Sequence, residues 1–141
     1  MCSQRRETKK HIEFTPDDII IFLEKLRKLV IYGKYIISKN EKRKENMDFI
    51  EDYKINTQKE KEILLSLQYE DFCYAVDNEK EKFYYEKLYI FSKAYELDNW
   101  GTLEFIDIYI KINMTQTRKG DDFMIIVSFH KRNKDIRYLF K

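Results

Sequence analysis

Three ionisable side chains occupy alternate positions near the C-terminal end of the sequence: Asp107, Tyr109 and Lys111. Isoleucines stand between and around them, at positions 106, 108, 110 and 112. Side chains of a strand alternate between its two faces, so this pattern predicts a half-buried strand with the isoleucines inward and the ionisable groups outward. An acid, a phenol and an ammonium on one face form a candidate surface for proton transfer at a phosphate.

A second apolar run, residues 123–130, follows after a turn and ends with Ser128 and His130. An unperturbed histidine titrates at about pH 6.5, which suits proton transfer. Residues 128–141 carry five Lys and Arg against one Asp, whereas residues 51–82 carry five Lys against nine acids. Local positive potential of this kind favours polyanion binding, and the alternative is an ordinary solvated charged surface.

The elements before these strands are predicted to be mainly helical. Thr15 and Pro16 start a helix as N-cap and first helical residue, apolar residues follow at helical spacing, and Gly33 suits its C-terminal cap. A capping box at residues 57–60 predicts a further helix from Gln58. The other expected elements are a short strand at 34–38, a charged loop at 40–46, a short helix at 47–53, and a short helix or turn at 69–74.

Strands dominate the sequence after Asp77. The expected elements are strands at 83–95, 103–113 and 123–130, a turn at 98–101, a hairpin loop at 115–121 and a short last strand at 136–140. Helices followed by hairpin-linked strands predict an α+β fold, with N-terminal helices packed on a C-terminal antiparallel sheet. We expect residues 1–14 to be a basic flexible arm and residues 15–141 to be a single domain.

The composition excludes several kinds of site. Glycines occur only at 33, 101 and 120, so neither a P-loop nor a dinucleotide-binding GxGxxG motif is present. The histidines are His11 and His130 and the cysteines are Cys2 and Cys73, which leaves no zinc-binding spacing. We therefore expect no metal and no cofactor, and metal-free acid–base chemistry if the protein is an enzyme.

The sequence carries no pattern for export or membrane insertion. The first ten residues are polar and charged, and no apolar run approaches the roughly 20 residues that a spanning helix needs. Two cysteines are too few for a disulfide framework. We expect a cytoplasmic protein with free thiols.

Two motifs of the strand pair resemble a known family. Ile108-Tyr109-Ile110-Lys111-Ile112, followed by Ile126-Val127-Ser128-Phe129-His130, is similar to the end of the MqsR-type toxins, which are mRNA interferases of the RelE-like superfamily. Upstream, Ile63-Leu64-Leu65-Ser66-Leu67 and Glu70-Asp71-Phe72 are similar to a further family segment, and Tyr89-Ile90-Phe91 stands where the family has a Trp-centred strand. The resemblance covers roughly residues 18–131 and implies a RelE-like fold.

The family's site residues carry over unevenly. Its strand tyrosine falls on Tyr109 and its lysine falls on Lys111. Its basic residue after Ser-Phe falls on His130, while a family lysine falls on Tyr74 and a family glutamine on Ile90. The resemblance therefore implies catalysis by Tyr109, Lys111 and His130, with three departures from the family pattern.

The resemblance implies a toxin of a type II toxin–antitoxin system: a metal-independent endoribonuclease that cleaves single-stranded mRNA by attack of the 2′-OH on the adjacent phosphorus. Such a protein has two partners, mRNA and a cognate antitoxin protein. Tyr109 and His130 would exchange protons, and Lys111 would stabilise the phosphate together with Lys131 or Arg132. The residues expected to contact RNA are Lys87, Tyr89, Lys93, Tyr74, Lys131 and Arg132.

Each assignment has a structural alternative. The strip from Lys87 to Tyr95 fits an RNA-stacking surface or an ordinary solvated sheet face. Asp107 fits a cross-strand salt bridge, and Asp71 with Phe72 fits a cap and a core anchor. For the whole protein, the alternative to the toxin is a catalytically weak or inactive RNA- or protein-binding module of the same fold. A small metabolic enzyme is a third, against which the absence of a cofactor motif argues.

Overall fold

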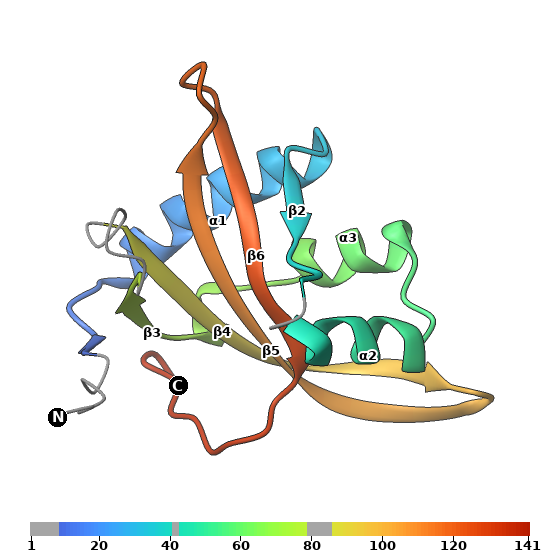
Figure 1. Cartoon of the computed structure of the whole chain (residues 1–141). Helices are drawn as coiled ribbons and strands as arrows, with labels where there is room; N and C mark the ends of the chain where they lie inside the picture. Colours follow the sequence, from blue (N-terminus) through green and yellow to red (C-terminus); the bar gives the residue numbers. More distant parts are fainter. Residues whose placement is uncertain (1–8, 41–42, 79–85) are drawn as a thin grey trace, which may run out of the picture.

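The computed structural model describes residues 9–40, 43–78 and 86–141, which form a six-stranded sheet and three α-helices (Figure 1). The helices are α1 (Pro16–Ile31), α2 (Lys44–Asp52) and α3 (Thr57–Leu65). The strands are β1 (Lys10–His11), β2 (Tyr35–Ile37), β3 (Phe72–Asp77), β4 (Lys87–Asn99), β5 (Thr102–Gln116) and β6 (Asp122–Lys131), and a 3₁₀ helix, η2 (Tyr69–Asp71), leads into β3. The predicted α+β class is confirmed.

The sheet order is β1-β3-β4-β5-β6-β2, and every neighbouring pair is antiparallel except β2 with β6. β4 and β5 form a long hairpin, whose register runs from Leu88 opposite Asn113 to Asn99 opposite Thr102. The hairpin-linked strands of the prediction are therefore present. The predicted start of the first of them, at residues 83–85, lies outside the described residues.

Side-chain caps fix where α1 and α3 begin. Thr15 accepts a hydrogen bond from the backbone N–H of Asp18, and the Asp18 carboxylate accepts one from the backbone N–H of Thr15, as the sequence predicts. α3 starts one residue before the predicted position because Asn56 caps it, and the Asn56 side chain accepts from the Lys59 N–H at 2.8 Å. Both caps satisfy backbone donors that have no partner inside the helix.

One face of the sheet, here called the helix face, packs against α1 and α3 (Figure 1). Phe22 of α1 stacks on Tyr89 of β4 with ring centroids 4.1 Å apart, and its centroid lies 5.9 Å from that of Phe91. The four alternating isoleucines of β5, at 106, 108, 110 and 112, lie in the same core and are at most 6% exposed. The apolar half of the predicted β5 alternation is confirmed.

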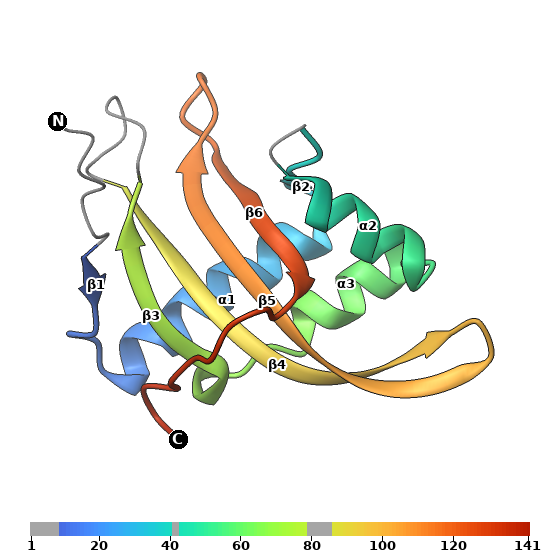
Figure 2. The same ribbon diagram turned by 60° about the horizontal axis from the view of Figure 1, so that its bottom comes forward.

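The opposite face of the sheet, here called the outer face, is covered as well. Residues 132–141, the C-terminal segment, leave β6 and cross this face (Figure 2), and the Leu139 N–H donates to the Phe72 carbonyl at 3.1 Å. Ile136 and Tyr138 pack on a second buried cluster, here called the outer cluster, which consists of Cys73, Tyr74, Val76, Leu88, Ile90 and Tyr109. The predicted strand at 136–140 is wrong, because this segment crosses the sheet instead of pairing with a strand.

Part of the predicted flexible arm at residues 1–14 belongs to the sheet. Lys10–His11 pairs with β3, and His11 Nε2 lies 2.8 Å from an Asp77 carboxylate oxygen. Phe14 packs edge-on against Phe72 with ring centroids 5.2 Å apart. The prediction of a flexible arm is therefore wrong for residues 10–14, because strand pairing and aromatic contact hold them against β3. Residues 1–8 lie outside the described residues.

Asn46 joins α2 to the edge of β6 and is fully buried. Its Nδ2 donates to the Ser38 carbonyl at 2.9 Å and to the Val127 carbonyl at 3.1 Å, and its Oδ1 accepts from the Phe129 N–H at 2.8 Å. β2 ends at Ile37, so the Asn46 amide takes the place of a backbone peptide group at the edge of β6. This side chain anchors α2 to the edge of β6, together with Phe49, which packs against Phe129.

Asn46→Ala is expected to lower the free energy of unfolding by about 3 kcal/mol, because each buried backbone group that loses its partner costs about 1–3 kcal/mol. Urea denaturation followed by circular dichroism measures the change. Asp48→Ala, at an exposed position of the same helix, is the control and should cost less than about 1 kcal/mol. Equal stability of the two variants would contradict a role for Asn46 in holding α2.

Candidate functional site

The structure brings the three predicted catalytic residues to the outer face. Tyr109 lies opposite His130 in the β5–β6 register, and their rings stack with centroids 5.4 Å apart and planes inclined by 25°. Lys111 lies two residues further along β5, opposite Ser128. The alternation of β5 is the local reason, since it turns these residues away from the helix face.

Tyr109 is buried, with only 6% of its surface exposed. Its hydroxyl is hydrogen-bonded to that of Tyr74, and Lys134 Nζ lies 5.3 Å from the centroid of its ring. Burial, with the neighbouring Tyr74 and Cys73, raises the pKa of the Tyr109 phenol well above its ordinary value. The phenol is therefore protonated at neutral pH, and it can donate a proton but cannot serve as a general base.

His130 is half-buried at the edge of the same face. Its Nδ1 lies 2.7 Å from the Lys131 carbonyl oxygen and 3.6 Å from a Glu45 carboxylate oxygen of α2. His130 also lines a groove of about 330 Å³ between α2 and the turn of the β4–β5 hairpin, together with the carboxylates of Glu45, Asp48 and Asp52. Negative charge in this groove opposes the approach of a phosphate to His130 from that side.

Cations lie against aromatic rings across the outer face. Each pair brings an ammonium within about 6 Å of a ring centroid, the range in which the ring attracts a cation. The pairs are Lys10 over Tyr74 at 4.7 Å, Lys134 over Tyr109 at 5.3 Å, and Lys141 over Tyr138 at 4.5 Å. The positive end of the sequence therefore becomes a positive surface of the fold.

The two predicted phosphate ligands after His130 have partners within the protein. Arg132 lies 3.4 Å from an Asp107 carboxylate oxygen, which confirms the salt-bridge role predicted for Asp107. Lys131 Nζ lies 5.9 Å from the centroid of the Tyr53 ring and lines the groove beside α2. Of these two residues, Arg132 is the one held at the outer face, by its salt bridge to Asp107 of β5.

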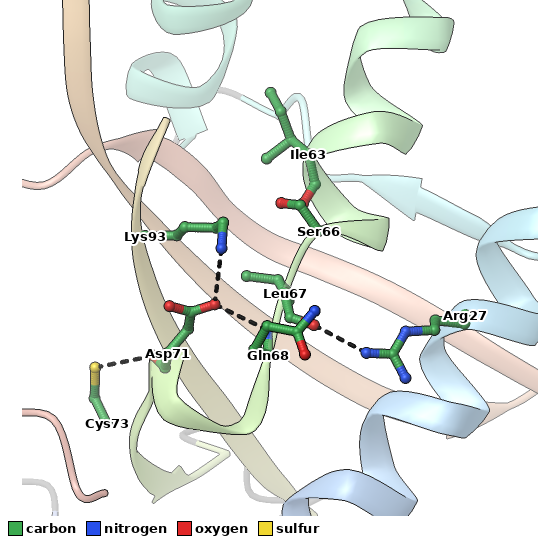
Figure 3. Close-up of polar contacts among 8 residues, drawn as sticks. All are labelled: Arg27, Ile63, Ser66, Leu67, Gln68, Asp71, Cys73 and Lys93. Atoms are coloured by element: carbon green, nitrogen blue, oxygen red, sulfur yellow. Dashed lines mark hydrogen bonds and ion pairs between the residues drawn. The ribbon is translucent and has the colours of Figure 1, made fainter. Parts of the chain in front are cut away.

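The predicted RNA-contact strip of β4 lies on the other side of the sheet. Alternation places Lys87, Tyr89 and Lys93 on the helix face, where Tyr89 stacks on Phe22. Lys93 Nζ lies 3.3 Å from an Asp71 carboxylate oxygen, as Figure 3 shows. These three residues lie on the opposite face of the sheet from Tyr109, and their contact with RNA stays a prediction.

Asp71 and Phe72 have the structural roles that the sequence indicates. The Asp71 carboxylate accepts from the Gln68 N–H at 2.8 Å and so closes the turn into β3 (Figure 3). Phe72 is fully buried and lies against both Phe91 and Phe140. Both residues stabilise the start of β3.

The C-terminal segment covers the outer cluster, a role that was not predicted from the sequence. Ile136 and Tyr138 are half-buried on the outer cluster, whereas Phe140 packs on the core of the helix face. Cys73 lies in the cluster that the segment covers, and it is 2% exposed. Burial raises the pKa of its thiol to about 12, so the native thiol is a poor nucleophile.

Comparisons with protein-family models, curated proteins and solved structures give no match to this chain. The MqsR-type resemblance therefore stays a prediction. Within residues 9–40, 43–78 and 86–141, no three side chains of His, Cys, Asp or Glu gather closely enough to hold a metal ion. Among the helices that the structure describes, none has the length and apolar character needed to cross a membrane.

Tyr109→Phe tests the buried phenol. Above about pH 10 the phenol ionises in the unfolded chain but not in the folded protein, where its pKa is raised, so stability is lost as the pH rises. The loss of unfolding free energy between about pH 9 and about pH 11 should be smaller in Tyr109→Phe, by about 1.4 kcal/mol. Urea denaturation at each pH measures it. Tyr32→Phe, which removes an exposed hydroxyl, is the control, and an identical loss in both variants would contradict the assignment.

Alkylation of Cys73 by iodoacetamide reports whether the C-terminal segment stays on the outer face. In a Cys2→Ser background, Tyr138→Ser is expected to raise the alkylation rate by about tenfold or more, because it removes a ring that packs on the cluster holding Cys73. Arg137→Ala, at the exposed neighbouring position, is the matched control. If Tyr138→Ser alkylates as slowly as the control, the segment is not what shields Cys73.

Proposed function

We propose that this chain is a catalytically weak or inactive RNA-binding module of RelE-like type, which binds single-stranded RNA on its outer face. The observation that carries the proposal is the set of cations around the buried Tyr74–Tyr109 pair. Lys10 lies over the Tyr74 ring and Lys134 over the Tyr109 ring. The positive charge of Arg43 opposes the rise in the pKa of the Tyr109 phenol. RNA phosphates bind such a field without a reacting group. The RelE-like arrangement of helices on the sheet is part of the proposal, and the stacking of Phe22 on Tyr89 supports it.

Two departures from the family pattern favour binding over cleavage. Tyr74 stands at the position of a family lysine and Ile90 at that of a family glutamine, and both belong to the outer cluster. Ile90 is 1% exposed and Tyr74 is 6% exposed. The family lysine and glutamine could each donate a hydrogen bond to a negatively charged phosphorane. Buried Tyr74 and Ile90 stand in their places, so these two donors are lost.

Cleavage of single-stranded RNA, as by a toxin, is the second candidate, and the meeting of Tyr109, Lys111 and His130 on one face favours it. His130 would accept the 2′-OH proton, Tyr109 would give a proton to the leaving 5′-oxygen, and Lys111 would balance the phosphorane charge. The C-terminal segment would have to leave the outer face first, since Tyr109 is buried in the cluster that it covers. A cognate antitoxin is expected with this candidate only.

Fluorescence anisotropy with a labelled uridine-rich RNA strand tests the binding surface. Lys10→Ala/Lys134→Ala should weaken binding by about tenfold and reduce the slope of log K against log salt by about 1.4, since each single-strand phosphate contact contributes about 0.7. Lys25→Ala/Lys28→Ala removes the same charge from exposed positions of α1 and is the matched control. Equal binding by the two double variants would contradict an outer-face site.

Expression in a bacterial host, with RNA integrity followed on gels, separates binding from cleavage. We expect normal growth and intact RNA at high expression of the native chain. Growth arrest with fragmented mRNA, lost in His130→Ala and in Lys111→Ala but kept in Lys28→Ala, would overturn the inactive-module proposal in favour of the toxin.

A further inference from the structure

The turn of the β4–β5 hairpin carries three large apolar side chains in water. Trp100 is 72% exposed, Leu103 66% and Phe105 74%. The hairpin extends past α2 and α3 in both views of the molecule (Figures 1 and 2). Leu103 and Phe105 alternate with inward residues, so both point to the same side of the hairpin as Asp107. A group of exposed apolar residues on a projecting element is typical of a docking surface.

The hairpin strands that carry these side chains bring only negative charge near the turn. Residues 94–110 contain four acids and no Lys or Arg, in a chain that has 27 basic residues. The β4–β5 register places Glu96 opposite Phe105 and Asp98 opposite Leu103, so a carboxylate accompanies each apolar side chain. RNA is repelled by this surface.

Trp100 also reaches the groove beside α2, on the side of the hairpin that carries Asn99. That groove has mixed charge, because Lys131 and His130 line it together with the carboxylates of α2. Lys54 Nζ lies 3.8 Å from the centroid of the Trp100 ring. The protein thus shows, with its own lysine, that an ammonium packs on this indole.

We propose that the β4–β5 hairpin turn docks a basic, amphipathic helical segment of another protein. Apolar side chains of that segment cover Trp100, Leu103 and Phe105, and its Lys and Arg side chains pair with Glu96 and Asp98, which lie beside Phe105 and Leu103 in the register. This surface lies at the hairpin turn, beyond Ile108, the last β5 residue paired with β6, and its charge has the opposite sign to that around the outer cluster.

The probe is a synthetic helical peptide of about 18 residues with leucines on one face and lysines on the other. Trp100 is the one tryptophan of the chain, so its emission reports directly on this surface. The peptide is expected to shift the emission to shorter wavelength, and Leu103→Ser/Phe105→Ser should weaken its binding by about tenfold or more. Ile21→Ser/Ile31→Ser removes two equally exposed apolar side chains from α1 and is the matched control.

Equal affinity of the native chain and the hairpin variant would overturn the proposal, as would equal affinity for a peptide whose lysines are replaced by glutamates. Light scattering that detects a dimer, lost in the hairpin variant, would assign the surface to a second copy and also overturn it. Circular dichroism establishes that the variant is folded. Binding of uridine-rich RNA should be unchanged in the hairpin variant, so this proposal and the proposed RNA binding succeed or fail independently.

Discussion

Burial of β5 on both faces is the constraint on which the rest of the structure depends. Its isoleucines pack under α1 and α3 on the helix face, and Tyr109 packs with the outer cluster on the opposite face. An interior strand can be buried on both faces only if two separate layers cover it. The helices form one layer and the C-terminal segment forms the other (Figure 2). Each layer brings its own side chains to the middle of β5, so the environment of Tyr109 and of the buried isoleucines is set by distant parts of the chain.

The double burial decides what the candidate catalytic residues can do. A tyrosine on an open sheet face would be available to solvent and substrate, whereas Tyr109 is held by Tyr74 and lies near Lys134. Its raised pKa makes it a hydrogen-bond donor at neutral pH. His130 keeps access to a groove, but that groove is lined by the carboxylates of α2. Residues with the right chemistry are therefore adjacent, and the surroundings favour binding over reaction.

The same sheet separates charges of opposite sign. Near the outer cluster, basic side chains of β1 and of the C-terminal segment lie over aromatic rings. At the hairpin turn, where neither the C-terminal segment nor β6 accompanies β5, carboxylates and exposed apolar side chains replace them. A net charge of only +2 conceals this division. Two surfaces of opposite charge suit partners of opposite charge, and this is the physical basis for assigning RNA to one and a basic protein segment to the other.

The sequence alone determined what depends on neighbours in the chain: the α+β class, the Thr15 cap, and the alternation that puts Tyr109 and Lys111 on one face of β5. That His130 lies opposite Tyr109 was decided by the register of β6 in the folded sheet. The sequence did not reveal that β1 belongs to the sheet, that Asn46 replaces a peptide group at the edge of β6, or that residues 132–141 cover the outer face. Those features join residues far apart in sequence. Periodicity and capping report which side of an element is apolar, but only the tertiary structure decides what covers that side, because covering depends on the packing of the whole chain.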